Sequence, residues 1–227
     1  MFILINKPTG MTSHDVISRM RRITNIRKIG HAGTLDPFAT GLLIVAIERE
    51  FTKEIRHFVK LDKEYIATVK LGEETDTYDR TGKKLKVEST KSEVNLDEIK
   101  KVLTKFTGRI LQLPPMYSAT KMGGKKLYEL ARQGIEVTRG PIDIEINSID
   151  LLEYKYPLLK IKVTCSSGTY IRSLAYDIGK ELKTGAYLEE LERTRIGKYK
   201  LTDAVDLEKL TDENWREYEI NISERSH

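Results

Sequence analysis

The chain contains one cysteine among its 227 residues, Cys165, so no disulfide can form within it. Chains without disulfides are typical of a reducing compartment, and we therefore expect a cytoplasmic protein. No apolar run approaches the roughly 20 residues that a membrane-spanning helix needs. The opening MFILINKPTG passes from a short apolar stretch directly into a lysine and a proline, unlike a secretory signal. We expect no partner in a membrane.

Several common catalytic motifs are also missing. There is no phosphate-binding loop, no G-x-G-x-x-G, no HExxH and no G-x-S-x-G nucleophile turn. The histidines are scattered along the chain: His14, His31, His57 and His227. Together with a single cysteine they cannot form an ordinary zinc site. If the protein is an enzyme, we expect it to work with its own side chains, without a metal and without a cofactor.

The net charge is +5 at pH 7, and its distribution is more informative than its size. Acidic residues are missing from residues 109–128 and 154–176, and Asp36 is the only one between Val16 and Ile47. All three stretches contain several lysines or arginines. Such clustering predicts one electropositive face, as in proteins that bind nucleic acids. The alternative is an ordinary solvated lysine surface.

The spacing of apolar residues predicts strands and helices without strict alternation. We expect strands at residues 2–6, 42–47, 65–71, 142–152 and 158–165, and helices at 12–23, 52–60, 95–106, 127–132 and 170–182. Thr12 or Ser13 is expected to cap the first helix, and Asn95 with Glu98 has the pattern of a capping box. Residues 73–82 are expected to form an exposed loop. The sequence predicts a mixed α/β fold, as one domain over residues 1–227. At about 109–140 a stiff proline-containing stretch leads into a flexible basic one, which is expected to be an inserted RNA-gripping segment or merely a linker.

The segment GHAGTLDPFATGLL, residues 30–43, is the most informative part of the chain. Its glycines permit close approach of the backbone to a ligand, and Pro37 biases Asp36 away from a helix. His31 is expected on the same loop as Asp36. A carboxylate is a competent nucleophile at the anomeric carbon of a sugar, as in covalent glycosidases. A lone Asp-Pro is more often a simple turn, and the basic surroundings are what favour chemistry here.

A second candidate is the segment from Ser167 to Arg172, SGTYIR. A predicted strand ends there and a helix begins, which presents backbone N–H groups while Tyr170 and Arg172 project nearby. The simpler interpretation is a helix start with an incidental arginine. Tyr65, in KEYIATVKLG, is a weaker candidate, because a tyrosine in a strand usually belongs to the core or its rim.

Taken together, six segments resemble the successive motifs of the TruB-type tRNA pseudouridine synthases. They are NKPTGMTSHDV, GHAGTLDPFATGLL, KEYIATVKLG, QLPPMYSATKMGGKKLYELAR, SSGTYIRSLAYDIG and GAYLEELERTRIG, and they span about residues 2–200. The resemblance implies the pseudouridine synthase catalytic fold, an α+β fold with a central mixed, mostly antiparallel sheet flanked by helices and loops. It also implies conversion of uridine 55 in the T loop of tRNA to pseudouridine, with no cofactor and no metal.

The same resemblance implies roles for residues of the first half of the chain. Asp36 corresponds to the catalytic aspartate. His31 matches the histidine that enters the T loop and takes the place of the extruded base. Tyr65 matches the tyrosine that packs on the uracil ring.

In the second half of the chain, Tyr170 and Arg172 match the tyrosine and arginine that line the pocket, and Leu191 matches a pocket leucine. The arginine is implied to pair with the catalytic aspartate, which would favour the charged carboxylate in a dry pocket. Two features depart from the family. Glu192 stands where consecutive arginines are common, and no C-terminal PUA-type domain is evident. The implied partner is the T stem-loop of tRNA, and a monomer is the default expectation.

Pseudouridine formation breaks the C1′–N1 bond and joins C1′ to C5 of the same uracil, so a single carboxylate can suffice. The sequence leaves open whether Asp36 attacks C1′ or removes a proton at C2′ through a glycal. It also leaves open which group removes the C5 proton, for which Tyr65 is a candidate. Two other functions remain as alternatives: a non-catalytic tRNA-binding or tRNA-folding factor, and a nucleoside hydrolase with a carboxylate nucleophile.

Overall fold

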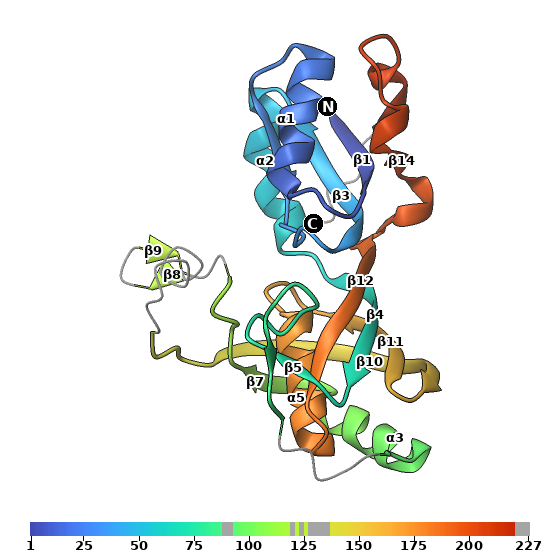
Figure 1. Cartoon of the computed structure of the whole chain (residues 1–227). Helices are drawn as coiled ribbons and strands as arrows, with labels where there is room; N and C mark the ends of the chain where they lie inside the picture. The colour runs from blue at the N-terminus through green and yellow to red at the C-terminus, as the bar shows by residue number, and fades with distance from the viewer. Residues whose placement is uncertain (88–92, 119–120, 123–124, 127–136, 221–227) are drawn as a thin grey trace. The chain divides into compact units, whose positions relative to one another are not determined.

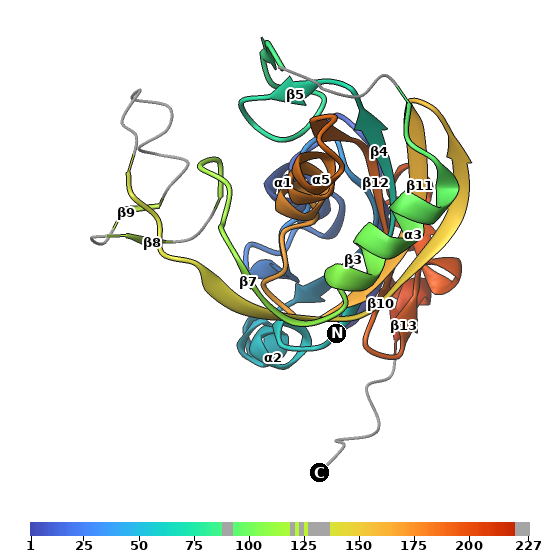
Figure 2. The same cartoon turned by 90° about the horizontal axis from the view of Figure 1, so that it is seen from below.

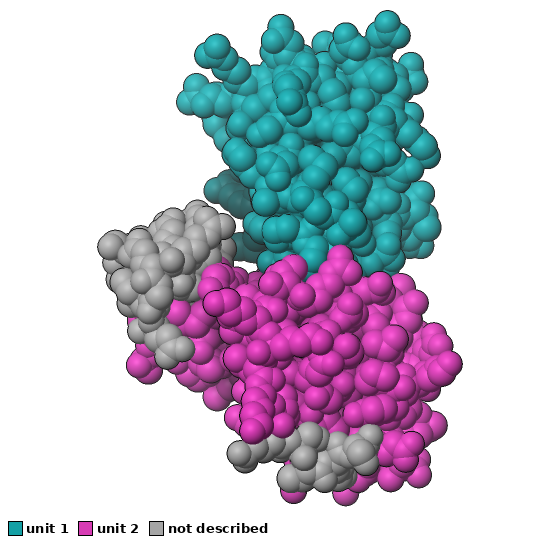
Figure 3. Space-filling model, in the orientation of Figure 1, with its two compact units in different colours: residues 1–65, 191–227 teal, residues 66–190 magenta. Residues whose placement is uncertain are grey.

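The structure is a computed structural model that describes residues 1–87, 93–118, 121–122, 125–126 and 137–220. The chain divides into two compact units (Figures 1 and 3). Unit 1 consists of Met1–Tyr65 and Leu191–His227, and unit 2 consists of Ile66–Glu190. Two strands, β4 (Lys63–Leu71) and β12 (Ala186–Ile196), carry residues of both units.

The central strand pair in the sheet of unit 1 is antiparallel and consists of β1 (Phe2–Lys7) and β3 (Thr40–Ile47). In this pair Phe2 lies opposite Ala46, and Lys7 lies opposite Gly41. The other strands of this sheet, besides β12, are β2 (Ile29–Ala32), β13 (Tyr199–Lys200), β14 (Val205–Asp206) and β15 (Glu219–Ile220). β2 runs antiparallel to β3, and β15 antiparallel to β1. The pairs β1–β14 and β3–β12 are parallel.

The helices of unit 1 cover this sheet. They are α1 (Ser13–Thr24), α2 (Arg49–Val59) and the short 3-10 helices η1 (Leu201–Asp203), η2 (Leu207–Lys209) and η3 (Trp215–Tyr218). α1 starts at a capping box: the Thr12 hydroxyl accepts a hydrogen bond from the Asp15 N–H, and the Asp15 carboxylate accepts one from the Thr12 N–H. Of the two predicted capping residues, Thr12 and Ser13, Thr12 is therefore the N-cap of α1.

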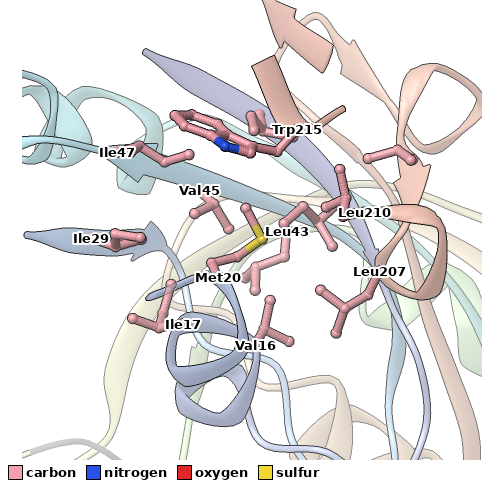
Figure 4. Packing of buried hydrophobic residues seen from close by; sticks show 13 residues of the cluster. Val16, Ile17, Met20, Ile29, Leu43, Val45, Ile47, Leu207, Leu210 and Trp215 are labelled. Carbon is pink, nitrogen blue, oxygen red and sulfur yellow. The ribbon is translucent and has the colours of Figure 1, made fainter. Parts of the chain in front are cut away.

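The core of unit 1 lies on both faces of β3, where every residue from Gly41 to Ile47 is buried. One face carries apolar side chains from α1 and from the C-terminal segment: Val16, Ile17, Met20, Leu207, Leu210 and Trp215 (Figure 4). On the other face Phe58 of α2 packs against Phe2, with ring centroids 4.9 Å apart. Burial on both faces explains why β3 is apolar without alternation. The strand thereby anchors one end of the loop that carries Asp36.

In unit 2 the strand order is β12-β4-β11-β10-β7, with β7 (Gly108–Gln112), β10 (Ile142–Lys155) and β11 (Leu158–Cys165). β10 is antiparallel to both of its neighbours. Figure 2 shows this sheet curving around α5 (Ile171–Leu182). The remaining elements are α3 (Leu96–Lys105), the pair β5 (Glu74–Thr75) and β6 (Lys84–Leu85), and the pair β8 (Lys121–Met122) and β9 (Lys125–Lys126).

The predicted fold class is confirmed, since the structure is mixed α+β with mostly antiparallel strand pairing. Element ends differ by a few residues: α2 begins at Arg49 instead of 52, and β10 continues to Lys155 instead of 152. The Asn95–Glu98 capping box is present at the start of α3. The helix predicted at 127–132 lies outside the described residues, as does most of the central part of the segment predicted at 109–140.

The prediction of an exposed loop at 73–82 is wrong for two of its residues. Thr75 and Asp79 are only 1% and 4% exposed. The Thr75 hydroxyl donates a 2.7 Å hydrogen bond to the Asp79 carbonyl, and Asp79 forms a parallel bridge with Leu188 of β12. The polar composition of residues 73–82 therefore did not indicate that Thr75 and Asp79 are buried in unit 2. Within the described residues no helix is long and apolar enough to cross a membrane.

Candidate active site

Asp36 lies half-buried in the loop between β2 and β3. Hydrogen bonds from the start of the chain hold this loop on both sides of the carboxylate. The Leu35 N–H donates to the Ser13 hydroxyl (2.9 Å), and the Gly10 N–H donates to the carbonyl of Pro37 (2.8 Å). Leu35 itself is buried beside Asp36. The loop is therefore fixed by backbone bonds and by burial of its apolar neighbours.

Lys7, the last residue of β1, is a charged group beside this loop that the sequence analysis missed. Its side chain is fully buried, and the ammonium donates to the carbonyls of Pro8 (2.9 Å), Met11 (2.6 Å) and Pro37 (3.4 Å). Burial lowers the pKa of Lys7 to about 8, and the negative charge of Asp36 opposes that decrease. The sequence does contain a signal that could have identified Lys7: this lysine ends an apolar strand and directly precedes the proline of a turn. Lys7 places positive charge near the Asp36 carboxylate.

His31 lies in β2, so its predicted place on the Asp36 loop is wrong. The correction has a simple cause: residues Ile29–Ala32 pair with β3 and extend the sheet before the loop begins. The imidazole is partly exposed. Burial lowers the pKa of His31, and the positive charge of Arg193 lowers it further. Both effects favour the neutral form of the ring.

Tyr65 and Leu191 lie on the strands that border this part of unit 1. Tyr65 is on β4 and 9% exposed, and Leu191 is on β12 and 7% exposed. The Leu191 carbonyl accepts a 3.5 Å hydrogen bond from the hydroxyl of Thr40, at the start of β3. Two residues further along β12, the buried Arg193 donates from Nε to the Leu42 carbonyl (2.8 Å) and from Nη2 to the Gly33 carbonyl (3.1 Å). Unit 1 thus contains four of the six predicted residues.

Arg172 belongs to unit 2, at the start of α5, and is buried. Its Nη1 lies 3.5 Å from Oδ2 of Asp79 and donates to the Thr77 carbonyl (3.2 Å). Its Nη2 donates to the Tyr117 carbonyl (2.7 Å). Arg172 was counted in a basic surface stretch, and that assignment is wrong, because these partners enclose it. Its implied pairing with Asp36 stays a prediction.

Asp79 is a second residue that sequence reasoning missed. Its carboxylate accepts hydrogen bonds from the hydroxyl of Thr77 (2.9 Å) and from the N–H (2.9 Å) and hydroxyl (2.5 Å) of Thr81. These bonds orient the carboxylate that pairs with Arg172. The run TDTYDRTG, with a threonine two residues on either side of Asp79, is the local signal for such a turn.

Tyr170 is the N-cap residue of α5, and its ring is half-buried. The side-chain amide of Gln112, at the end of β7, bonds both backbone groups of Tyr170. The Tyr170 N–H donates to Oε1 of Gln112 (2.8 Å), and Nε2 of Gln112 donates to the Tyr170 carbonyl (3.0 Å). Gln112 is 1% exposed. The start of α5 is therefore held by a buried side chain from the edge of the sheet.

No group of three histidine, cysteine, aspartate or glutamate side chains in the described part of the chain is placed to hold a metal ion. The arrangement in unit 1 instead offers one half-buried carboxylate, a buried ammonium, a neutral imidazole and a buried phenol. Such a set can carry out proton transfer or nucleophilic attack on a sugar, with a ring surface for a base.

Comparison with known proteins supports this chemistry. Residues 21–171 match the N-terminal domain of TruB family pseudouridylate synthases, and residues 172–224 match the C-terminal domain of tRNA pseudouridylate synthase B. The tRNA pseudouridine synthase B of Clostridium novyi (strain NT) is 49% identical over 222 residues, which cover 97% of this chain and 75% of that protein. Its counterpart in Protochlamydia amoebophila (strain UWE25) is 48% identical over 206 residues, 90% and 77% of the two chains.

A solved structure agrees with this assignment. One chain in the crystal structure of a Cbf5-Nop10-Gar1 complex matches with a TM-score of 0.74 and 32% identity. The match covers 97% of this chain and 56% of that one, so the present chain spans little more than half of that relative. The family matches and the motif order together cover most of the sequence. The chain therefore belongs to the TruB family of pseudouridylate synthases, and it is a tRNA-modifying isomerase.

Proposed function

We propose that this enzyme converts uridine 55 in the T loop of tRNA to pseudouridine, with Asp36 as the catalytic carboxylate. The observation that carries the proposal is the loop of Asp36: a half-buried carboxylate, held by backbone bonds on both sides, with the buried Lys7 ammonium nearby. Positive charge near a carboxylate favours its ionised form. An ionised carboxylate is what either chemical route requires.

The reaction needs no external donor or acceptor. In one route an Asp36 oxygen bonds to C1′ while the C1′–N1 bond breaks, and the uracil keeps the electron pair of that bond. The uracil turns, C5 bonds to C1′ and the carboxylate is released. In the other route Asp36 removes the C2′ proton as the C1′–N1 bond breaks, which forms a glycal, and it returns that proton to C2′ when C5 bonds to C1′. In both, C5 finally loses its proton and N1 gains one, so atoms and charge balance.

The base must leave the T loop to reach Asp36. Extrusion costs a few kcal/mol, and stacking of the base on the Tyr65 ring would return about 1–3 kcal/mol. His31 would occupy the vacated place in the T loop. Its neutral ring suits that role, because an uncharged imidazole stacks between bases without a counterion. Leu191, Tyr170 and Arg172 would line the pocket, with Arg172 pairing with Asp36 in the complex.

The test is incubation of the purified protein with unmodified tRNA and no additives in buffer of low salt. We expect pseudouridine at position 55 alone, mapped with a carbodiimide adduct that marks the isomer, and none in a tRNA whose position 55 is cytidine. Asp36→Asn should abolish conversion while leaving the Kd for tRNA within about threefold, because binding depends on phosphate contacts. The matched control is Glu50→Gln, an exposed carboxylate of the same unit.

Three outcomes would overturn the proposal. Full conversion by Asp36→Asn would remove the carboxylate from the chemistry. Binding of tRNA by the parent protein with no pseudouridine at any position would favour the non-catalytic tRNA-folding factor instead. Release of free uracil would indicate the nucleoside hydrolase. We further propose that the enzyme acts as a cytoplasmic monomer, which size-exclusion chromatography with and without tRNA would check.

A further inference from the structure

We infer that Gln112 is a positioning residue of this enzyme, because its buried amide fixes the backbone of Tyr170, one of the residues proposed to line the pocket. The inference rests on the function proposed above. Gln112 is the last residue of β7 and Tyr170 is the N-cap residue of α5, so 58 residues separate them along the chain. Both residues belong to unit 2.

The burial of Gln112 reverses the usual order of polar and apolar side chains. Gln112 is 1% exposed, whereas its neighbours Leu111 and Leu113 are 66% and 42% exposed. Successive side chains of a strand point to opposite faces, so the end of β7 directs an amide inward and an apolar side chain outward. A buried amide is costly unless its groups are bonded, and a leucine would fill similar space without that cost. The residue type at position 112 is therefore explained by what its amide binds.

The amide of Gln112 bonds one residue at both of its ends. Oε1 accepts a hydrogen bond from the Tyr170 N–H (2.8 Å), and Nε2 donates one to the Tyr170 carbonyl (3.0 Å). These two backbone groups belong to the peptide units on either side of the Tyr170 Cα atom. Because both peptide units are held, the direction of the Cα–Cβ bond is held too. The amide thus sets the point from which the Tyr170 ring projects.

The start of α5 depends on this restraint, because a tyrosine is an unusual N-cap residue. Serine, threonine, aspartate and asparagine are favoured there, since their short side chains accept a hydrogen bond from the first turn. In the described first turn of α5, the Tyr170 side chain makes no capping hydrogen bond, and its backbone is extended (φ −98°, ψ 105°). Gln112 therefore supplies from a distant strand a restraint that a capping side chain normally supplies locally.

Two further hydrogen bonds hold the same turn of α5 from the segment that follows β7. The Ser173 hydroxyl donates to the Leu113 carbonyl (2.7 Å), and Nη2 of Arg172 donates to the Tyr117 carbonyl (2.7 Å). Ser173 is 2% exposed and Arg172 is 4% exposed. These bonds do not involve the buried amide, so its loss should release Tyr170 while the rest of the turn stays in place.

The proposed reaction explains why Tyr170 needs a fixed backbone. A tyrosine ring turns about only two side-chain bonds, so its place beside the uracil follows from the direction of its Cα–Cβ bond. A shift of about 1 Å in such a group can slow a reaction about a hundredfold. The affinity for tRNA depends mainly on phosphate contacts. Loss of the Gln112 amide should therefore slow the chemical step and leave binding nearly unchanged.

The test is Gln112→Met, which keeps the length of the side chain and removes both hydrogen bonds. At saturating protein, single-turnover formation of pseudouridine should slow by more than about tenfold, with the Kd for tRNA changed by less than about threefold. In a Tyr170→Ala background the same change should slow the residual rate by less than about threefold, because the positioned ring is already gone. An unchanged rate in Gln112→Met would overturn the inference, and so would equal losses in both backgrounds.

Tyr154→Phe is the matched control. It removes a hydroxyl that donates to the Val94 carbonyl (2.7 Å), which is also a side-chain bond to a distant backbone group of unit 2, 60 residues away in the chain. This bond joins β10 to the segment before α3 and does not touch the start of α5. Tyr154→Phe should therefore leave the single-turnover rate unchanged. A loss as large as that of Gln112→Met would overturn the inference.

A second readout does not depend on activity. Hydrogen exchange of single amides, followed by NMR, reports whether the Tyr170 N–H is bonded. In Gln112→Met its exchange should accelerate at least about tenfold more than that of the Ile178 N–H, further along α5. Equal acceleration of both amides would show a general loss of stability and would overturn the inference, even if the parent enzyme proves inactive. Inactivity of the parent alone would instead refute the proposed function.

Discussion

Arg172 and Asp79 form a buried ion pair, with 3.5 Å between Nη1 of the arginine and Oδ2 of the aspartate. Their side chains are 5% and 6% exposed. The aspartate is in turn held by two threonines, and the arginine by two backbone carbonyls. The position of the guanidinium is therefore set within unit 2, before any substrate binds. In the proposed reaction this prior placement would spare the enzyme the entropy of ordering Arg172 against Asp36.

Asp79→Asn should destabilise the protein and slow the reaction. The amide keeps the shape of the carboxylate but leaves the Arg172 charge buried without a counterion. Removing one partner of a buried pair costs about 3–5 kcal/mol, and retained hydrogen bonds should bring the loss to roughly 2–3 kcal/mol. Urea unfolding measures this loss, and single-turnover conversion should fall by about tenfold or more.

The control for this variant is Asp76→Asn in the same segment. Asp76 is exposed, and its carboxylate accepts a 2.8 Å hydrogen bond from the Lys83 N–H without pairing with Arg172. Asp76→Asn should change neither the free energy of unfolding nor the single-turnover rate by much. Wild-type stability and turnover in Asp79→Asn would show that the pair does not position Arg172.

The stability of the protein should rise at alkaline pH through Lys7. Burial lowers the pKa of Lys7 to about 8 from its ordinary 10.5. Between these values the unfolded chain binds more protons than the folded one, so the free energy of unfolding increases with pH across this window. Relative to Lys7→Met, the parent should gain on the order of 2–3 kcal/mol from about pH 7.5 to about pH 10.5.

The measurement is urea unfolding of both proteins across that range, read as the difference between them. Tyrosines titrate in the same window in both proteins, and their contribution cancels in the difference. Lys7→Met also leaves the Pro8, Met11 and Pro37 carbonyls without their donor, which should lower its stability at every pH. A difference that stays flat from pH 7.5 to 10.5 would contradict the lowered pKa.

Asp177→Asn should stabilise the protein at neutral pH. Burial raises the pKa of Asp177, on α5, to about 6 from 3.8, although Lys180 opposes the increase. Between these values the folded state binds more protons than the unfolded chain, so stability falls as pH rises through 6. The neutral asparagine avoids this loss. We expect a gain of about 1–2 kcal/mol at pH 7 that shrinks towards zero below about pH 4.

Glu181→Gln, on the same helix, should change the stability at pH 7 in the opposite direction. A hydrogen bond from Lys105 lowers the pKa of the exposed Glu181, so its charged form is favoured in the folded state. Its replacement should therefore lower stability slightly at pH 7, and the effect should vanish in acid. Denaturant unfolding of both variants at pH 4 and pH 7 would distinguish them. A loss of stability in Asp177→Asn at pH 7 would contradict the prediction.

Much of the secondary structure of this chain follows from its sequence, because the patterns that specify it are local, but the strands β2, β7 and β12 were not predicted. The capping residues of α1 and α3 lie within three positions of their partners. β4 alternates buried and half-buried residues along its whole length, as its apolar period of two predicts. The loop of Asp36 is likewise marked by its own glycines and proline. The predicted ends of α2 and β10 each differ from the structure by three residues, because element boundaries are the part of a fold that local patterns specify least.

The candidate site is different, because its supporting contacts join distant parts of the chain. Arg193 and Gly33 are 160 residues apart, and Arg172 and Thr77 are 95 apart. The sequence marked Asp36, His31, Tyr65, Tyr170, Arg172 and Leu191 through short motifs. It did not mark Lys7 or Arg193, whose partners are backbone carbonyls that any residue type supplies, and it did not mark Asp79, whose partner Arg172 lies far along the chain. Local patterns thus determined the elements and the chemically active loop, whereas tertiary packing decided which charged side chains became buried and what they hold in place.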